Sequence, residues 1–274
     1  MTPDIQDLQR RAAKIREAVL RTISHAGAGH TGGSLSAVEI MAALYFHAMR
    51  VDPLRPDWPE RDRCILSKGH SSPVWYCALA EKGFFPYEKL KEFDRLDGML
   101  QGHPDMLKTP GVDISGGSLG QGLSVGIGMA LAGRALKKDF YVFVVMGDGE
   151  LQEGQVWEAA MYAGFHKIHR LIAIVDYNKI QLTGRVAEVL DPEPLADKWR
   201  SFGWEVLECD GHDPAELAGK FDQARKTAVK PVVILAHTVK GSGVTFIADR
   251  AEWHARAPNQ AELKLALAEL EVKE

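Results

Sequence analysis

Gly147-Asp148-Gly149 and Asn178 are the residues of this sequence best suited to bind a metal ion together with a diphosphate. The apolar segment 141–145 is expected to be a strand, so Asp148 should stand just past its carboxyl end. The next apolar segment, 171–175, leads to Asn178, and 178 − 148 = 30 residues return the chain to the same edge. Carboxylate and amide oxygens suit Mg²⁺, which binds octahedrally and keeps phosphate oxygens among its ligands. The spacing therefore predicts a site for magnesium and a diphosphate.

Gly149 and the segment after it add two features that favour a phosphate group. Glycine has no Cβ, so the backbone can approach phosphate closely. The helical pattern that begins near Gly154 would add a favourable dipole if its amino-terminal end faces the anion. A Gly-Asp-Gly tripeptide alone is usually a simple turn. The prediction therefore depends on the strand before it and on Asn178 after the following strand.

Short apolar segments alternate with helical patterns along most of the chain. The expected strands are 64–66, 141–145, 171–175, 205–207 and 232–236, and the clearest helical patterns are 121–136, 154–165 and 214–227. Strands that are apolar on both faces and alternate with helices are typical of a mostly parallel β-sheet flanked by helices. The predicted fold class is α/β, and ligands in such folds gather beyond the carboxyl ends of the strands.

The chain is expected to form a single domain over residues 1–274, because no repeat, low-complexity segment or linker divides it. Apolar residues at three- and four-residue steps predict an amino-terminal helix over about 4–25. A second such pattern predicts a carboxyl-terminal helix over about 260–271. Leu263, Leu267 and Leu270 share one face of it, which either closes the domain or touches a partner.

The composition is that of an ordinary globular protein, with 46% hydrophobic and 26% charged residues and a formal net charge of 33 − 37 = −4. This balance argues against nucleic-acid and membrane-surface partners. Cys64, Cys77 and Cys209 lie far apart, in no spacing that indicates disulfides or zinc. The sequence shows no apolar signal segment and no run long enough to span a bilayer, so a cytoplasmic location is expected.

The Gly-Asp-Gly tripeptide, Glu153 and Asn178 together resemble the cofactor motif of thiamine-diphosphate enzymes. Five further segments resemble those of transketolases, and they occur in the order found in that family. They cover residues 24–33, 61–70, 101–105, 117–122 and 253–258. The resemblance runs from about Ala13 to Ala261 and corresponds to the diphosphate-binding domain of the family. Thr31 and Ser118 stand where the family usually has proline, which bears on substrate preference more than on cofactor binding.

The resemblance implies thiamine diphosphate and Mg²⁺ as cofactors. It assigns Asp148, Asn178 and the carbonyl of Ile180 to the metal. It places a larger group of residues around the cofactor: His70, Ser118, Leu119, Gly120, Gly147, Asp148, Gly149, Glu150, Asn178 and Lys240. For two of these features a plainer interpretation stays open. The glycines between positions 116 and 128 could serve only loop and helix packing, and Lys240 could be a solvated charge after a strand.

The same resemblance assigns catalytic roles to His30, His103 and His254, which would line the pocket where the sugars meet the cofactor. Breaking the C2–C3 bond of a ketose requires removal of the C3 hydroxyl proton, and neutral imidazole accepts a proton near neutral pH. Glu153 corresponds to a glutamate that touches the catalytic carboxylate of the partner chain. Alternatively, Glu153 only stabilises the start of a helix through its charge.

The sequence contains no place for the glutamate that activates the aminopyrimidine of thiamine, which belongs to a separate pyrimidine-binding domain in this family. We therefore expect a C-terminal transketolase subunit, carrying the pyrimidine-binding and C-terminal domains, to be the partner. The assembly is expected to be α2β2, by analogy with the symmetric dimers of the family. Its substrates would be sugar phosphates.

Other functions within and outside the family stay open. A related thiamine enzyme would use another substrate, as in an apulose- or sulfo-sugar transketolase, a 1-deoxyxylulose-5-phosphate synthase-like enzyme or a 2-oxo-acid dehydrogenase component. His103-Pro104 and Gly120-Gln121-Gly122 favour transketolase chemistry over decarboxylation of an oxo acid. A domain that binds the cofactor without turnover is the non-enzymatic alternative, and the intact Asp148 and Asn178 argue against it.

Overall fold

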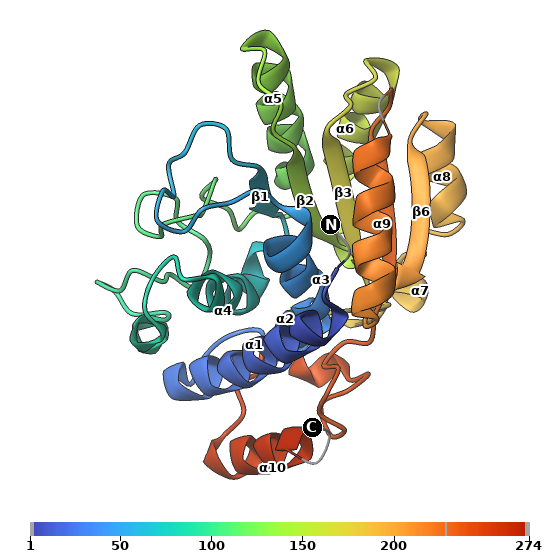
Figure 1. Cartoon of the computed structure of the whole chain (residues 1–274). Helices are drawn as coiled ribbons and strands as arrows, with labels where there is room; N and C mark the ends of the chain where they lie inside the picture. Colours follow the sequence, from blue (N-terminus) through green and yellow to red (C-terminus); the bar gives the residue numbers. More distant parts are fainter. Residues whose placement is uncertain (1–2, 228, 272–274) are drawn as a thin grey trace.

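Five parallel strands form the central sheet, in the order β1-β2-β3-β7-β6 (Figure 1). The computed structural model describes residues 3–227 and 229–271. The strands are β1 (Arg63–Leu66), β2 (Val142–Gly147), β3 (Leu171–Tyr177), β7 (Val232–His237) and β6 (Glu205–Asp210). A small antiparallel hairpin pairs β4 (Ile180–Gln181) with β5 (Gly184–Arg185). The predicted α/β class with a mostly parallel sheet is confirmed.

Alternate side chains of the central strands enter two hydrophobic cores, one on each face of the sheet. On β2, Phe143 and Val145 join one core, and Val144 and Met146 join the other. Both faces of a central parallel strand are covered, which explains why these segments are almost continuously apolar in the sequence. β2 is longer than the predicted segment 141–145, because its ladder with β3 continues to Gly147. Asp148 therefore follows the last paired residue directly.

Helices cover both faces of the sheet. The first core is shared by α1 (Ile5–Ala26), α3 (Val38–Ala43), α4 (Ser72–Lys82) and α9 (Pro214–Lys226). The second core is shared by α5 (Gln121–Ala135), α6 (Gly154–Phe165) and α8 (Leu195–Ser201). The shorter helices are α2 (Thr31–Ser36), α7 (Val186–Val189), a π-helix η1 (Leu44–Ala48) and the 3₁₀ turns η2 (Gly69–Ser71), η3 (Tyr87–Glu92), η4 (Gly149–Gln152) and η5 (Ala251–Trp253).

The two terminal helices pack against each other, and Figure 1 shows α1 between the sheet and α10 (Gln260–Glu271). α1 begins where the Asp4 carboxylate accepts from the Asp7 N–H at 3.0 Å, and it ends at Gly27, whose φ is 70°. The leucines on the apolar face of α10 pack against the first core: Leu263, Leu267 and Leu270. Of the two roles predicted for this face, the structure supports closing the domain.

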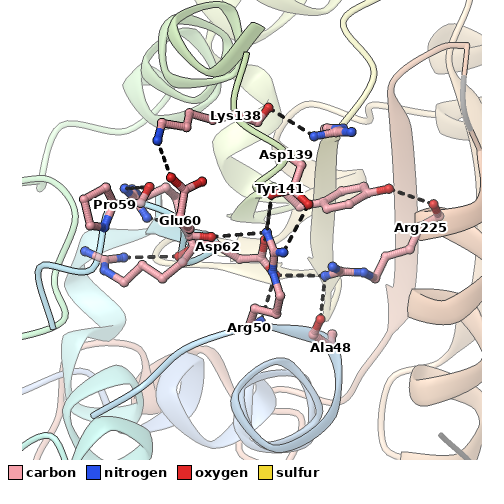
Figure 2. Close-up of polar contacts among 12 residues, drawn as sticks. Ala48, Arg50, Pro59, Glu60, Asp62, Lys138, Asp139, Tyr141 and Arg225 are labelled. Carbon is pink, nitrogen blue, oxygen red and sulfur yellow. Dashed lines mark hydrogen bonds and ion pairs between the residues drawn. The ribbon is translucent and has the colours of Figure 1, made fainter. Parts of the chain in front are cut away.

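A polar network around Asp62 ties the amino-terminal edge of the sheet together (Figure 2). The fully buried Asp62 carboxylate accepts hydrogen bonds from Arg50 N at 2.8 Å, Tyr141 N at 2.7 Å and Arg225 Nη1 at 2.9 Å. The Arg225 guanidinium also lies 4.2 Å from the centroid of the Tyr141 ring. The network joins the segments before β1 and β2 to the end of α9.

All three cysteines are buried and free, as Cys64, Cys77 and Cys209 form no disulfide. Within residues 3–227 and 229–271, no helix combines the length and apolar character that crossing a bilayer requires.

Candidate functional site

The carboxyl ends of four neighbouring strands bring most of the predicted site residues to one edge of the sheet. His70 follows β1, Asp148 follows β2, Asn178 follows β3 and Lys240 follows β7. Loops and helix ends supply the other three predicted histidines. His30 precedes α2, His103 lies in a loop and His254 follows η5. The arrangement matches the general rule that α/β sheets bind ligands beyond the carboxyl ends of their strands.

His30, His70 and His254 form a compact cluster of rings. The ring centroids are 5.0 Å apart for His30 and His70, 5.4 Å for His30 and His254, and 5.1 Å for His70 and His254. Burial, reinforced by the positive charge of Lys68, lowers the pKa of His70 to about 2. Burial and the Lys240 ammonium lower the pKa of His254 to about 3, and burial with His103 lowers the pKa of His30. All three rings are therefore neutral near pH 7.

His103 lies on the exposed side of this cluster, against the glycine loop before α5. A Cβ on Gly117 would lie 3.2 Å from His103 Cδ2, so the loop backbone and the ring are in close contact. Gly117 has a φ of 148°, a conformation that favours glycine. Ser118 beside it is exposed and Leu119 is half-buried. The loop thus presents backbone and small side chains to the same space as His103.

Asp148, Asn178 and the carbonyl of Ile180 are positioned by hydrogen bonds to backbone and side chains. The Asp148 carboxylate is 2% exposed and accepts from Gly149 N at 2.8 Å and from Lys179 N. Asn178 donates through Nδ2 to Asp176 Oδ2 at 3.2 Å and accepts through Oδ1 from Ile180 N at 3.1 Å. These two contacts fix which side of the amide presents oxygen.

The electrostatics of this group fit a hard cation. Burial, reinforced by the nearby Asp176 carboxylate, raises the pKa of Asp148 to about 7, and its two N–H donors offset this only in part. The Ile180 carbonyl accepts from the Lys240 ammonium, with Nζ 3.0 Å from the oxygen. Within the described residues no three His, Cys, Asp or Glu side chains gather around one metal position. One carboxylate with neutral oxygens is a donor set that suits Mg²⁺.

Lys240 is a buried part of the site, with a side chain that is only 2% exposed. The alternative that it is a solvated charge is therefore wrong. Burial, reinforced by Lys68, lowers the pKa of its ammonium to about 8. Besides Ile180, its Nζ contacts His254 Nδ1 at 2.9 Å. Because an ammonium can only donate, Nδ1 accepts and His254 carries its ring proton on Nε2.

Glu150 is turned into the protein, although the resemblance to transketolases assigned it to the cofactor. Its carboxylate is 3% exposed and accepts from Gly120 N at 2.9 Å, from Gly147 N at 3.0 Å and from the hydroxyl of Ser67. These three bonds occupy the carboxylate, so its observed role is to hold the loop at Gly120 against the turn after β2.

Glu153 lies on the surface at the start of α6, close to the glycine loop. A Cβ on Gly120, whose φ is 80°, would lie 2.8 Å from Glu153 Cβ, so only glycine allows this approach. Glu153 occupies the N-cap position of α6, but its side chain makes no capping hydrogen bond. The exposed carboxylate is therefore available to a neighbouring molecule.

Two residues that the sequence did not single out form the buried centre beneath the site. The fully buried Asp176 carboxylate accepts from the Lys68 ammonium, from Ser36 Oγ at 2.6 Å and from the Thr238 hydroxyl, in addition to Asn178. Lys68 also donates to the Gly33 carbonyl at 2.7 Å. The one available signal was an aspartate and a lysine placed directly at the ends of apolar strands.

Comparison with known proteins places this geometry in a family. Residues 8–273 match the model described as the transketolase, thiamine diphosphate binding domain. The chain belongs to the transketolase family.

Some relatives are about as long as this chain, and others contain this domain within a chain more than twice as long. The chain is 48% identical to the 6-deoxy-6-sulfo-D-fructose transketolase subunit SqwG of Clostridium sp. (strain MSTE9), covering 97% of this chain and 96% of the relative. It is 44% identical to an apulose-4-phosphate transketolase subunit of Actinobacillus succinogenes, with 96% of each chain covered. The solved transketolase of Campylobacter jejuni superposes with a TM-score of 0.92 at 32% identity, over 98% of this chain but 43% of that one.

Proposed function

We propose that this chain is the N-terminal subunit of a split transketolase. In the proposed reaction it binds thiamine diphosphate and Mg²⁺ and, with a separate C-terminal subunit, transfers a two-carbon ketol unit between sugar phosphates. One observation carries the proposal. The buried Asp148 carboxylate, which forms no ion pair within residues 3–227 and 229–271, stands beside Asn178 and the Ile180 carbonyl, at the edge where the neutral histidine cluster lies.

Each proposed ligand has a chemical reason. Asp148, Asn178 and the Ile180 carbonyl would hold Mg²⁺ through oxygen. At Gly147 and Gly149, which lack a Cβ, the backbone would approach the diphosphate. The remaining residues proposed to contact the cofactor are His70, Lys240, Ser118, Leu119 and Gly120. When bound, thiamine diphosphate supplies the electron sink for carbon–carbon bond cleavage.

The proposed proton transfers fall to His30, His103 and His254. The lowered pKa of His30 leaves its ring neutral, so an unprotonated ring nitrogen of His30 would be free to take the proton of a sugar C3 hydroxyl. His254 carries its proton on Nε2 because Lys240 donates to Nδ1. That Nε2–H can hold a sugar oxygen while a neighbouring histidine takes the proton. His103, on the exposed side, would meet the substrate first.

A partner subunit is part of the proposal, because the glutamate that activates the cofactor in this family has no counterpart in the described site. Two named relatives of nearly equal length are themselves subunits, and the chain spans 43% of a solved transketolase. α6 leads away from Glu153 and exposes Met161, Tyr162 and Phe165 on its surface. We propose that the C-terminal subunit covers this apolar face and meets Glu153 at its end, within an α2β2 assembly.

The choice of sugar is the finer part of the proposal. The 48% identity to a subunit named for 6-deoxy-6-sulfo-D-fructose favours a sulfo-sugar transketolase as the second candidate. The apulose-4-phosphate relative, at 44%, supports the same general chemistry on another sugar. Both candidates use the same residues of this chain, because the groups that hold the anionic end of the sugar are expected on the partner subunit.

The decisive experiment combines the purified chain with its candidate C-terminal subunit, thiamine diphosphate and Mg²⁺. Xylulose 5-phosphate and 6-deoxy-6-sulfofructose are offered as ketol donors with an aldose phosphate acceptor, and products are followed by mass spectrometry. We expect ketol transfer only when both chains and both cofactors are present. Cofactor binding without transfer from any ketose would reject the transketolase assignment and leave the non-catalytic alternative.

A further inference from the structure

The segment 239–243, called the Lys240 loop below, is held to the surrounding chain by hydrogen bonds to its backbone. Gly241 N donates to the Gly32 carbonyl at 3.0 Å, and Asp249 N donates to the Lys240 carbonyl at 2.8 Å. A side chain also binds this backbone: the Val239 N–H donates to His212 Nε2 at 2.8 Å. His212 lies after β6, so this bond connects the turns that follow two neighbouring strands.

The orientation of His212 is fixed by its second ring nitrogen. Since the Val239 N–H can only donate, Nε2 of His212 accepts and the ring proton lies on Nδ1. Nδ1 is 3.0 Å from Glu39 Oε2, so it donates to that carboxylate. Both nitrogens of the ring are thus occupied, one by the Lys240 loop and one by α3.

Glu39 is in turn held by Arg16 of α1, which also reaches the Lys240 loop. Arg16 Nη2 donates to Glu39 Oε1, and Arg16 Nε donates to the Ser242 carbonyl at 3.2 Å. Glu39 and Arg16 are 7% and 9% exposed. Burial alone would raise the pKa of Glu39, but Arg16 and then His212 outweigh it and lower that pKa, so the carboxylate is ionised. Arg16, Glu39 and His212 therefore hold the Lys240 loop at Val239 and at Ser242.

We infer that His212 is a positioning residue for the Lys240 ammonium, acting through the Val239 N–H with Glu39 and Arg16 behind it. Lys240 Nζ lies between the Ile180 carbonyl and His254 Nδ1, at 3.0 and 2.9 Å. A displacement of its backbone would shift Nζ relative to both acceptors, and such bonds weaken steeply with distance and angle. The inference rests on the proposed function only insofar as Lys240 faces the cofactor.

The test compares two substitutions of His212 with a matched control. His212→Phe keeps a planar ring but removes both hydrogen bonds, whereas His212→Gln retains one acceptor and one donor. His47→Phe is the control, because His47 is also partly buried and pairs with a carboxylate, with Nε2 3.0 Å from Asp222 Oδ1, away from the site. Each variant is studied with the candidate C-terminal subunit present, and also alone.

Two readouts are measured. The first is deuterium exchange of the backbone amides in 237–243 in the chain alone. The second is the affinity of the two-chain mixture for thiamine diphosphate at saturating Mg²⁺. We expect His212→Phe to accelerate exchange in this segment and to weaken cofactor binding about ten-fold, at the lower end of the effect of removing groups that orient metal ligands. His212→Gln should recover most of both, and His47→Phe should change neither.

The inference is overturned if His212→Phe leaves exchange in 237–243 and cofactor affinity at the wild-type level. It is also overturned if His47→Phe reproduces both effects, since this would indicate a general loss of stability. Failure of the proposed function has a different signature. The wild-type mixture would then transfer no ketol unit, while exchange in the Lys240 loop would still report whether His212 holds it.

Discussion

Asp62, just before the edge strand β1, and Asp148, just after β2, are both buried carboxylates, but within the described residues only Asp62 has arginine partners. At the amino-terminal edge, Arg225 Nη1 lies 2.9 Å from Asp62 and Arg50 Nη2 lies 3.7 Å away, in addition to two backbone donors (Figure 2). At the opposite edge, Asp148 accepts from two backbone N–H groups, and burial with the charge of Asp176 raises its pKa to about 7.

The difference separates a group that stabilises the fold from one that we propose as a metal ligand. A buried ion pair with all its partners is costly to break, because removing one member leaves the other charged and unpaired. A buried carboxylate with too few positive neighbours has the opposite property, since it destabilises the chain until a cation arrives. The ion pairs at the amino-terminal edge of the sheet thus support the architecture, whereas the carboxylate at the carboxyl-terminal edge is the one we propose for cation binding.

The largest expected effect is on folding, from Asp62→Ala. Removing this carboxylate should lower the free energy of unfolding by about 3–5 kcal/mol, because Arg225 and Arg50 lose their buried partner. Urea denaturation of the chain measures it. Asp139→Ala is the control, because Asp139 pairs with Arg50 at the exposed end of the same network and should cost less than about 1 kcal/mol. An equal loss of unfolding free energy in the two variants would show that the buried Asp62 carboxylate matters no more to stability than the exposed Asp139.

Asp148→Asn should weaken ligand binding without lowering the stability of the chain. We expect the affinity for Mg²⁺ and thiamine diphosphate to fall about 100-fold, near the upper end of effects measured even for groups behind a metal ligand. The free energy of unfolding of the metal-free chain should not fall, because the substitution removes a poorly compensated charge. Calorimetric titration and urea denaturation give the two values. A clear loss of stability would contradict the view that Asp148 serves binding.

The histidine cluster should make the carboxyl-terminal edge sensitive to acid. The pKa of His70 lies near 2, below its ordinary 6.5, so the unfolded chain binds a proton there that the folded chain does not. Stability therefore falls as the pH drops below about 6.5, and His70→Asn should reduce this slope by up to about 1.4 kcal/mol per pH unit. Denaturation curves between pH 4.5 and 8 test this. At pH 8 the ring is neutral in both states, so any remaining difference there reports packing alone.

The smallest effect concerns α6, which extends from the site edge toward the other edge. Phe165 is 80% exposed near the end of α6, and Phe165→Asp should weaken assembly with the C-terminal subunit about ten-fold if the partner covers this face. The stability of the isolated chain should stay within about 0.5 kcal/mol. Sedimentation of the mixture measures assembly, with Leu54→Asp as an equally exposed control on the 52–59 loop. If Phe165→Asp leaves assembly unchanged, the partner does not cover this end of α6 and contacts only the end near Glu153.

The sequence predicted best those elements whose pattern is local. The α6 and α10 ranges agree with 154–165 and 260–271, and the strands were recognisable because both faces of a central parallel strand are apolar. It did not reveal α2, α3 and η1, since nearly every residue in 31–48 is buried and no polar face marks a helical period. The strand order was also hidden, because β7 enters between β3 and β6, out of chain order.

For the site, the sequence identified residues inside motifs and missed those that join one motif to another. Asp148, Asn178 and the four histidines are placed at one edge, as their segments suggested. Asp176 and its donors Ser36, Lys68 and Thr238 come from four separate elements. Their meeting depends on the strand order, which local patterns do not encode. Glu150 shows the converse, since its position beside Gly149 says nothing about the inward direction of its side chain.

The Lys240 ammonium and a metal ion would compete for the Ile180 carbonyl oxygen. This ammonium already donates to the Ile180 carbonyl, so a divalent ion bound at the proposed site would meet a like charge there. The apparent affinity for Mg²⁺ alone should therefore be weaker than the oxygen ligands would provide on their own. A diphosphate would draw the ammonium toward itself and free the carbonyl. Metal and cofactor should then strengthen each other's binding by the same factor, as reciprocal linkage requires.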